Sequence, residues 1–142
     1  MKKEKLDTQT LIGHIKSSLN IDEALIYSNN SRAPTFSCCL NEMMQQHDCT
    51  ISQIIIRANI SKAFAYQILN GNRIPGRDLL LRITFAMNLT LEETQYMLTL
   101  ARRGPLYPKL RRDAAIIFGI EKGYTAEQTS DLLESIDEPP LL

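Results

Sequence analysis

Residues with reactive side chains are few in this chain, and they do not form a catalytic pattern. Three cysteines and a histidine lie near one another, at Cys38, Cys39, His47 and Cys49. Cys39 and His47 fall on the apolar stripe of a helical pattern, and the paired spacing of zinc ligands is missing. No nucleophile–base–acid set, phosphate-binding glycine loop or metal-binding His-Glu motif occurs. We therefore expect neither an enzyme, nor a cofactor, nor a metal site.

Positive charge gathers in the middle of the chain, although the formal net charge is zero. Residues 57–112 carry ten basic and three acidic side chains, a local charge of +7. Residues 113–142 carry one basic and seven acidic side chains, a local charge of −6. The middle can therefore bind a polyanion such as nucleic acid, and the tail cannot. A solvated basic surface would have the same composition.

Helical periodicity predicts the elements that position these charges. The chain has no valine and no run of alternating polarity, so we expect an all-α fold. Capping boxes at Thr50–Gln53 and Thr90–Glu93 mark two helix starts. A short helix is also expected within residues 6–26, followed by a polar linker over 28–34. Five helices are expected in the central part of the chain, including the two that the capping boxes begin. They start after Thr35, Thr50, Ser61, Pro75 and Thr90, and they end, in the same order, near His47, Ala58, Leu69, Met87 and Arg102.

Residues 112–142 repeat residues 77–107 with a shift of 35 positions. Eight of the 31 aligned positions are identical, and the second copy has its own capping box at Thr125–Gln128. Two copies are too few for a solenoid, so we expect a duplicated helical hairpin that extends one core. The last residues, 138–142, either fray or dock in a groove like their counterparts at 103–107.

The expected organisation has three parts: residues 1–34 form an N-terminal helix and linker, 35–104 the central domain, and 105–142 the C-terminal hairpin. The longest nearly apolar run, 114–120, has seven residues, whereas a membrane span needs roughly 20. No signal-peptide core follows the basic start, so a cytoplasmic protein without membrane contact is expected.

Residues 50–75 carry a family resemblance. Two short helices joined by a tight turn lead into Asn70-Gly-Asn-Arg-Ile-Pro75, and Leu89-Thr-Leu-Glu-Glu93 opens a later helix. Over residues 36–101 this order of patterns resembles the phage-repressor-like (XRE) family of helix-turn-helix proteins. The resemblance implies a lambda-repressor-like five-helix domain. It also implies a sequence-specific transcriptional regulator that inserts a recognition helix, at about 61–69, into the major groove of double-stranded DNA.

The resemblance also implies roles for individual residues. Lys62 would reach a guanine or a phosphate, Gln67 an adenine edge, and Ala63 a thymine methyl group. Such regulators usually bind two half-sites, so a homodimer is expected, paired through the C-terminal hairpin or the N-terminal helix. A regulatory protein partner is also conceivable. The implied base contacts are Ser61, Lys62, Ala63, Tyr66 and Gln67, and the implied phosphate contacts are Thr50, Asn70, Asn72, Arg73 and Arg77.

Two positions depart from the family pattern and keep a second function open. Ile51 and Ile56 stand where the family usually has polar residues. An exposed Ile56 would suit a protein partner, so the chain is alternatively a protein-interaction adaptor or an antitoxin that uses the helical repeat. The basic residues that flank Gly104-Pro105 either extend the phosphate contacts or pair with the acidic tail.

Overall fold

The computed structural model describes residues 8–17, 20 and 35–142, and it divides the chain into two compact units, 1–34 and 35–142. In the first unit, α1 (Thr8–Ser17) lies within the range predicted for an N-terminal helix. The predicted linker over 28–34 lies outside the described residues.

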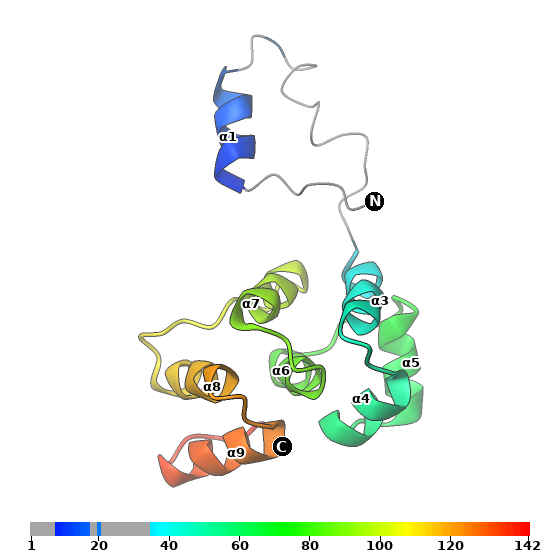
Figure 1. The fold of residues 1–142 in the computed structure, drawn as a ribbon, viewed down its shortest axis with the longest axis vertical. Coiled ribbons are helices and arrows are strands. Elements are labelled where there is room, and N and C mark those ends of the chain that lie inside the picture. The colour runs from blue at the N-terminus through cyan, green and yellow to red at the C-terminus, as the bar shows by residue number, and fades with distance from the viewer. Residues whose placement is uncertain (1–7, 18–19, 21–34) are drawn as a thin grey trace. The chain divides into compact units, whose positions relative to one another are not determined.

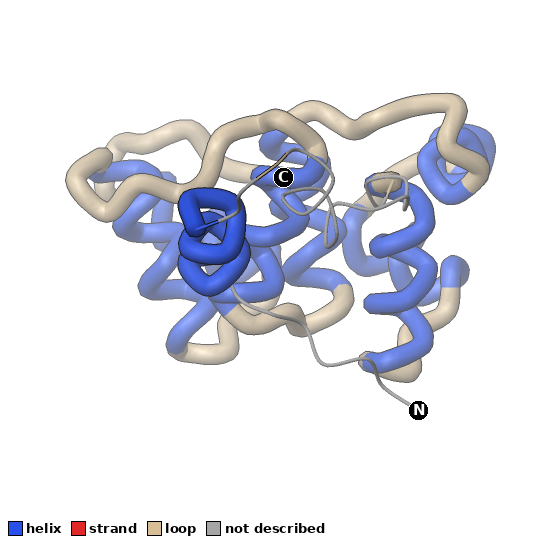
Figure 2. The backbone as a smooth tube through the Cα atoms, turned by 90° about the horizontal axis from the view of Figure 1, so that it is seen from above, coloured by secondary structure: helices blue, strands red, loops and turns tan. Residues whose placement is uncertain are grey.

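The second unit is built from helices, which Figures 1 and 2 show joined by turns and by longer loops, such as the one between α7 and α8. No strand occurs in the described part of the chain, so the prediction of an all-α fold is confirmed. None of its helices is long and apolar enough to cross a membrane. The helices are α3 (Phe36–Gln46), α4 (Ile51–Ala58), α5 (Lys62–Leu69), α6 (Arg77–Ala86), α7 (Leu91–Leu100), α8 (Arg111–Glu121) and α9 (Ala126–Ser135).

Hydroxyl side chains fix the starts of five of these helices. Thr35 and Ser61 accept hydrogen bonds from the backbone N–H groups of Cys38 and Phe64. The predicted capping boxes at Thr50, Thr90 and Thr125 all form, with the hydroxyl and the side chain three residues later each bonded to the other residue's N–H. Each such cap stabilises its helix by about 1 kcal/mol. The chain therefore sets these helix boundaries locally, before any tertiary contact.

Helix α6 lies at the centre of the core, in contact with α4, α7 and α9. Six of its ten residues are buried, including Leu80, Leu81 and Ile83. The same core continues through Ile116 and Leu133 of the C-terminal hairpin, both fully buried. Residues 35–104 and 105–142 therefore contribute to one core within a single compact unit.

The two repeated hairpins exchange ion pairs. Arg77 of the first copy binds Asp113 of the second at 2.8 and 3.0 Å, and Arg112 binds Asp78 at the same two distances. These four residues occupy equivalent positions in the two copies. Helix α6 likewise contacts α9 while α7 contacts α8. The duplicated hairpins therefore pack about an approximate two-fold axis.

The ends of both hairpins dock against their own copy. Leu106 and its counterpart Leu141 are both buried. Gln95 accepts a hydrogen bond from the N–H of Leu106, and the equivalent Ser130 accepts one from the N–H of Leu141. The C-terminal residues therefore dock as their counterparts do, and the expectation of a frayed end is wrong.

Candidate nucleic-acid interface

Helix α5 presents one polar face to solvent and rests on a buried one. Ala65 and Ile68 are 3% and 1% exposed and pack into the core. The five residues predicted to contact bases lie on the opposite side and at the helix start. All are exposed, and Tyr66 keeps 43% of its surface accessible. They are Ser61, Lys62, Ala63, Tyr66 and Gln67.

Contacts from neighbouring helices hold α5 in place. The turn before it ends α4 with Asn59 in the left-handed conformation, at φ 53°. Arg82 of α6 donates hydrogen bonds to the carbonyls of Ala58 and Asn59, at 2.8 and 2.6 Å. At the other end of α5, Asn41 donates to the carbonyl of Leu69. Arg82 therefore anchors the end of α4 and the turn that leads into α5, and Asn41 contacts the C-terminal end of α5 itself.

Four of the predicted phosphate contacts flank this face and are exposed: Thr50, Asn70, Asn72 and Arg73. The Thr50 hydroxyl caps α4, so the first N–H groups of that helix lie beside it. Arg73 follows the end of α5, and its guanidinium lies 5.3 Å from the centre of the Phe64 ring. Asn70, Asn72 and Arg73 thus follow the C-terminal end of α5, whereas Thr50 lies at the start of α4.

Arg77, the fifth predicted phosphate contact, is committed elsewhere. Its guanidinium forms a two-bond ion pair with Asp113 and also donates to the carbonyls of Gly104 and Pro105. Asp113 is 3% exposed, so this pair is a structural link between the repeats. We therefore correct the prediction and leave Arg77 out of the interface.

Most of the basic middle is used in the same structural way. Arg57 and Arg103 donate to backbone carbonyls, and Arg111 pairs with Glu138 of the acidic tail at 3.8 Å. Among the described residues, four basic side chains of this region make no hydrogen bond or ion pair. They are Lys62, Arg73, Arg102 and Lys109, of which the first two lie at α5.

Arg57 and Arg82 bind backbone carbonyls of neighbouring helices, and neither role was predicted from the sequence. Arg82 interrupts the apolar run Leu79–Ile83, and a charged residue within such a run indicates a partner in the fold. That pattern is visible in the sequence. The partner of Arg82 is not, because the carbonyls of Ala58 and Asn59 are free to accept a hydrogen bond only where α4 ends.

The two departures from the family pattern differ in environment. Ile51 is half-buried at the start of α4, whereas Ile56 is 79% exposed. Ile56 borders a hollow of about 390 Å³ between the ends of α4 and α6 and the start of α9, whose wall includes Leu142. Ile51 thus contributes to packing, and Ile56 is an apolar side chain on the surface.

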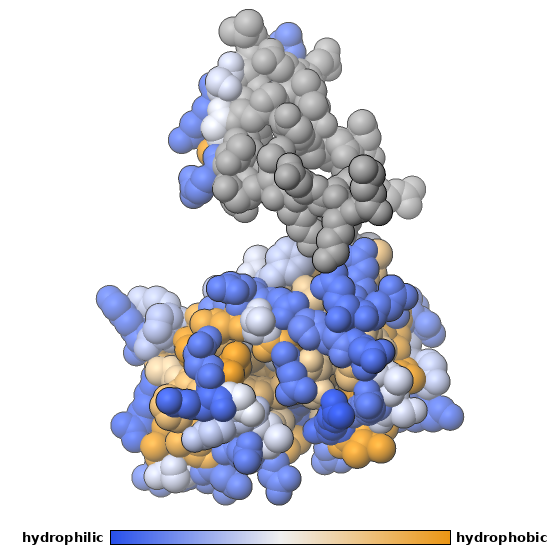
Figure 3. Space-filling model, in the orientation of Figure 1, coloured by the Kyte–Doolittle hydropathy of each residue, from blue (hydrophilic) through white to orange (hydrophobic). Residues whose placement is uncertain are grey.

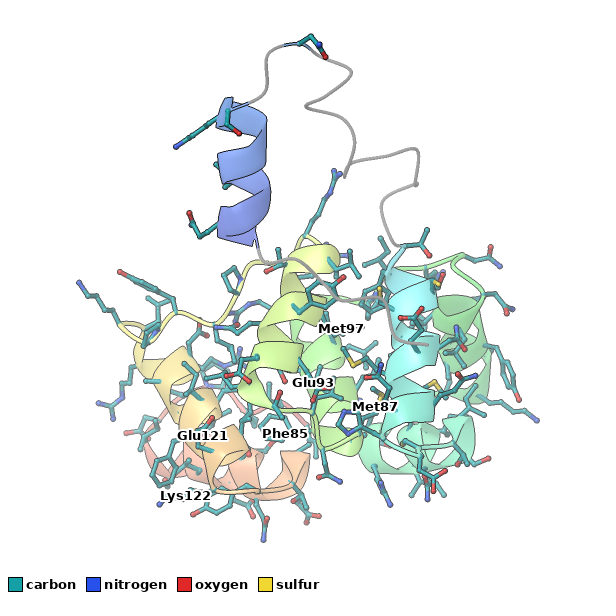
Figure 4. All side chains as sticks on the ribbon, turned by 45° about the horizontal axis from the view of Figure 1, so that its top comes forward. Phe85, Met87, Glu93, Met97, Glu121 and Lys122 are labelled. Carbon is teal, nitrogen blue, oxygen red and sulfur yellow. The ribbon has the colours of Figure 1, made fainter. Side chains whose placement is uncertain are left out.

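The cysteine and histidine group takes part in side-chain contacts between α3 and α7. His47 lies 2.8 Å from the Glu93 carboxylate, and the Cys39 sulfur lies 3.8 Å from the Tyr96 hydroxyl. Figure 4 shows Glu93 and Met97 on α7. Burial raises the pKa of the Cys49 thiol, although the charge of Arg57 opposes this, so the neutral thiol is favoured. No group of three metal-binding side chains occurs within the described ranges.

Comparison with known protein families, curated proteins and solved structures finds no match for this chain. The assignment of a function therefore depends on the geometry of the second unit.

Proposed function

We propose that residues 35–142 bind double-stranded DNA, with α5 entering the major groove, and that the protein is a sequence-specific transcriptional regulator. The observation that carries this proposal is the exposed polar face of α5, whose buried side packs into the core through Ala65 and Ile68. An eight-residue helix is about 12 Å long, and a major groove about 12 Å wide admits a helix.

The side chains on this face have the chemistry needed to read base edges. Lys62 can donate to guanine, and Gln67 can both donate to and accept from adenine. Ala63 is small and apolar, which suits contact with a thymine methyl group. Its small size also allows the helix backbone to approach the groove. The face therefore combines one charged, one amide and one apolar group within a single helix.

The flanking residues would orient the helix on the duplex. Arg73 supplies a fixed positive charge beside α5, and Asn70 and Asn72 supply amide donors. Phosphate contacts of this kind set register and carry most of the salt dependence. With Lys62 and Arg73 as the nearby cations without ion pairs, non-specific binding is expected to be weak, of order 10⁻⁴–10⁻⁶ M at physiological salt.

Selection from a pool of random duplexes with the full chain tests this function. A recovered consensus sequence, bound more weakly as salt rises, supports the proposal. Gln67→Ala is expected to relax the preference at one base pair, at a cost of about 1–3 kcal/mol. Failure to enrich any sequence at low salt would contradict it.

The exposure of Ile56 favours a second candidate, an adaptor or antitoxin that binds another protein. An apolar side chain that is 79% exposed beside a hollow suits insertion into a partner. Under this alternative, Ile56→Ser abolishes a stable complex with another protein, and Lys62→Glu leaves that complex intact. If the chain binds DNA through α5, Lys62→Glu abolishes duplex binding and Ile56→Ser leaves it intact.

A further inference from the structure

The internal repeat allows each face of α8 to be compared with the same face of α6. Residues 79, 82, 83 and 86 of α6 lie beneath α4, where Arg82 binds the end of α4 and Ala86 accepts a hydrogen bond from Arg57. Ile83 on this face is 1% exposed. A shift of 35 places these residues on Ala114, Ile117, Phe118 and Glu121.

Within residues 35–142, no helix covers this face of α8 as α4 covers α6. Phe118, the counterpart of Ile83, is 45% exposed, and Leu110 just before the helix is 55% exposed. Hollows confirm the difference. Ala86 lines the hollow whose wall includes Ile56 and Arg57 of α4, whereas its counterpart Glu121 lines a hollow formed with the start of α7, at Thr90, Leu91 and Glu92.

The Phe118 ring is held in its exposed position. The Tyr124 ring meets it edge to face at 6.0 Å, and the Lys122 ammonium lies 5.5 Å from its centre. Glu121 and Lys122 lie at the C-terminal end of α8 (Figure 4). Figure 3 shows hydrophobic residues, in orange, among hydrophilic ones on one side of the second unit.

The residues of this face are arranged for packing against themselves. Arg111, Ala114, Phe118 and Glu121 recur at steps of three, four and three, which forms one stripe along α8. Two antiparallel copies of this stripe, related by a two-fold axis at the level of residue 116, place Phe118 of each copy over the small Ala114 of the other. The same register places each Arg111 opposite the Glu121 of the other copy.

We propose that this face of α8 is the dimer interface, and that its partner is a second copy of the chain packed antiparallel. Arg111 donates a hydrogen bond to the carbonyl of Ile136 and contacts Glu138, but its side chain is 68% exposed, so its remaining N–H groups can reach a second carboxylate. A two-fold interface uses the same patch on both subunits, as this stripe does.

The interface would leave α5 free. In Figure 1, α8 and α5 lie on opposite sides of α6 within the second unit. The inference deepens the proposed DNA-binding function, since a dimer supplies the second half-site, but it stands on the α8 geometry alone. One helix face is smaller than the roughly 800 Å² per partner of a standard interface, so self-association in solution should be weak.

Sedimentation equilibrium of the full chain without DNA, from about 10 μM to about 1 mM, tests the dimer. The chain is expected to dimerise within this range. Arg111→Glu and Glu121→Arg should each weaken dimerisation by about tenfold or more, because each places like charges opposite one another. Mixing the two variants should restore dimers, since the mixed pair has opposite charges at both contacts.

Two further variants locate the surface. Phe118→Ser is expected to weaken the dimer by more than about tenfold, whereas Ile56→Ser, a matched change at another exposed apolar residue, should leave it intact. A chain that stays monomeric at the highest concentration overturns the proposal. So do variant mixtures that fail to dimerise, or dimers that respond to Ile56→Ser and not to Phe118→Ser.

The DNA-binding proposal is tested separately, because α5 is unchanged in these variants. Phe118→Ser should bind a single half-site as the original chain does and should lose the added affinity for paired half-sites. If the original chain binds no duplex, only the proposed DNA-binding function is contradicted. If the chain binds DNA but stays monomeric, only the proposed dimer interface is contradicted.

Discussion

Helices α6 and α8 come from two copies of one sequence pattern, yet one is a core helix and the other lies at the edge of the unit. Both carry an Arg-Asp pair in their first turn, and each arginine binds the aspartate of the other copy. The two helices differ in what covers them, because α4 packs on α6 and no helix of residues 35–142 packs on the same face of α8.

The two copies exchange equivalent ion pairs but differ on one face. The equivalent residues Leu98 and Leu133 are both fully buried. The face that binds α4 in the first copy has no such helix of residues 35–142 on it in the second. Arg82, which anchors the end of α4, has Ile117 as its counterpart, so the second copy has an apolar side chain in place of the polar anchor.

The exchanged ion pairs give the largest expected difference between the copies. Asp113 is 3% exposed and also accepts a hydrogen bond from the N–H of Tyr107. Asp113→Ala leaves Arg77 without its partner and should lower the free energy of unfolding by about 3–5 kcal/mol. In Asp78→Ala the lost carboxylate was half exposed, so the cost should stay below about 1 kcal/mol. Urea denaturation measures both, and equal costs would contradict the asymmetry.

The covered and uncovered faces should respond differently to truncation. Ile83→Ala removes a side chain packed beneath α4 and should cost about 2–5 kcal/mol. Phe118→Ala removes a half-exposed ring and should cost the monomer well under half of that. Thermal unfolding at low protein concentration makes the comparison. A larger cost at Phe118 would show that something covers it within the chain.

Gly119 marks the close approach of α8 to α9. A Cβ atom there would lie 2.5 Å from the Thr129 hydroxyl oxygen, whereas the equivalent α6 position is Thr84, which has room for a side chain. Gly119→Ala should therefore cost about 1–3 kcal/mol, although alanine is the better helix former. Adding Thr129→Ala should recover much of this loss. Stabilisation by Gly119→Ala alone would refute the close contact.

Acid should weaken the link between the copies. Burial pushes the pKa of Asp113 upward, but hydrogen bonds from Arg77 and the Tyr107 N–H, together with the charges of Arg77 and Arg112, outweigh burial and lower it. Its stabilising effect is thus complete above the ordinary aspartate pKa, near 4, and is lost as the pH falls through the lowered value. Asp113→Asn should flatten this part of the pH–stability profile, and an unchanged profile would contradict the assignment.

Much of this fold follows from the sequence because its determinants are local. The capping boxes at Thr50, Thr90 and Thr125 each lie within four residues, and all three form as predicted. The repeat was visible as a shift of 35 positions. The inward positions of Ala65 and Ile68 followed from helical periodicity, and the exposure of Lys62 and Gln67 was implied by the family resemblance.

The fate of the arginines could not be predicted in this way. Arg77 was assigned to phosphate because it follows α5 in the chain, but its partner Asp113 lies 36 residues away. Pairing across the repeats depends on how the hairpins pack, and periodicity does not specify that. The local charge of +7 therefore overstated the cations available to a nucleic acid.

The contact between α5 and DNA is tested most simply by two lysine variants of the full chain. The measured quantity is the affinity of each variant for a non-specific duplex at low salt. Lys62→Glu reverses a charge on the exposed face of α5, and Lys109→Glu makes the same change before α8. Both side chains are exposed, and neither makes an ion pair among the described residues. The account predicts that Lys62→Glu abolishes binding while Lys109→Glu largely preserves it. Equal effects, or binding unchanged by Lys62→Glu, would contradict the claim that α5 contacts DNA.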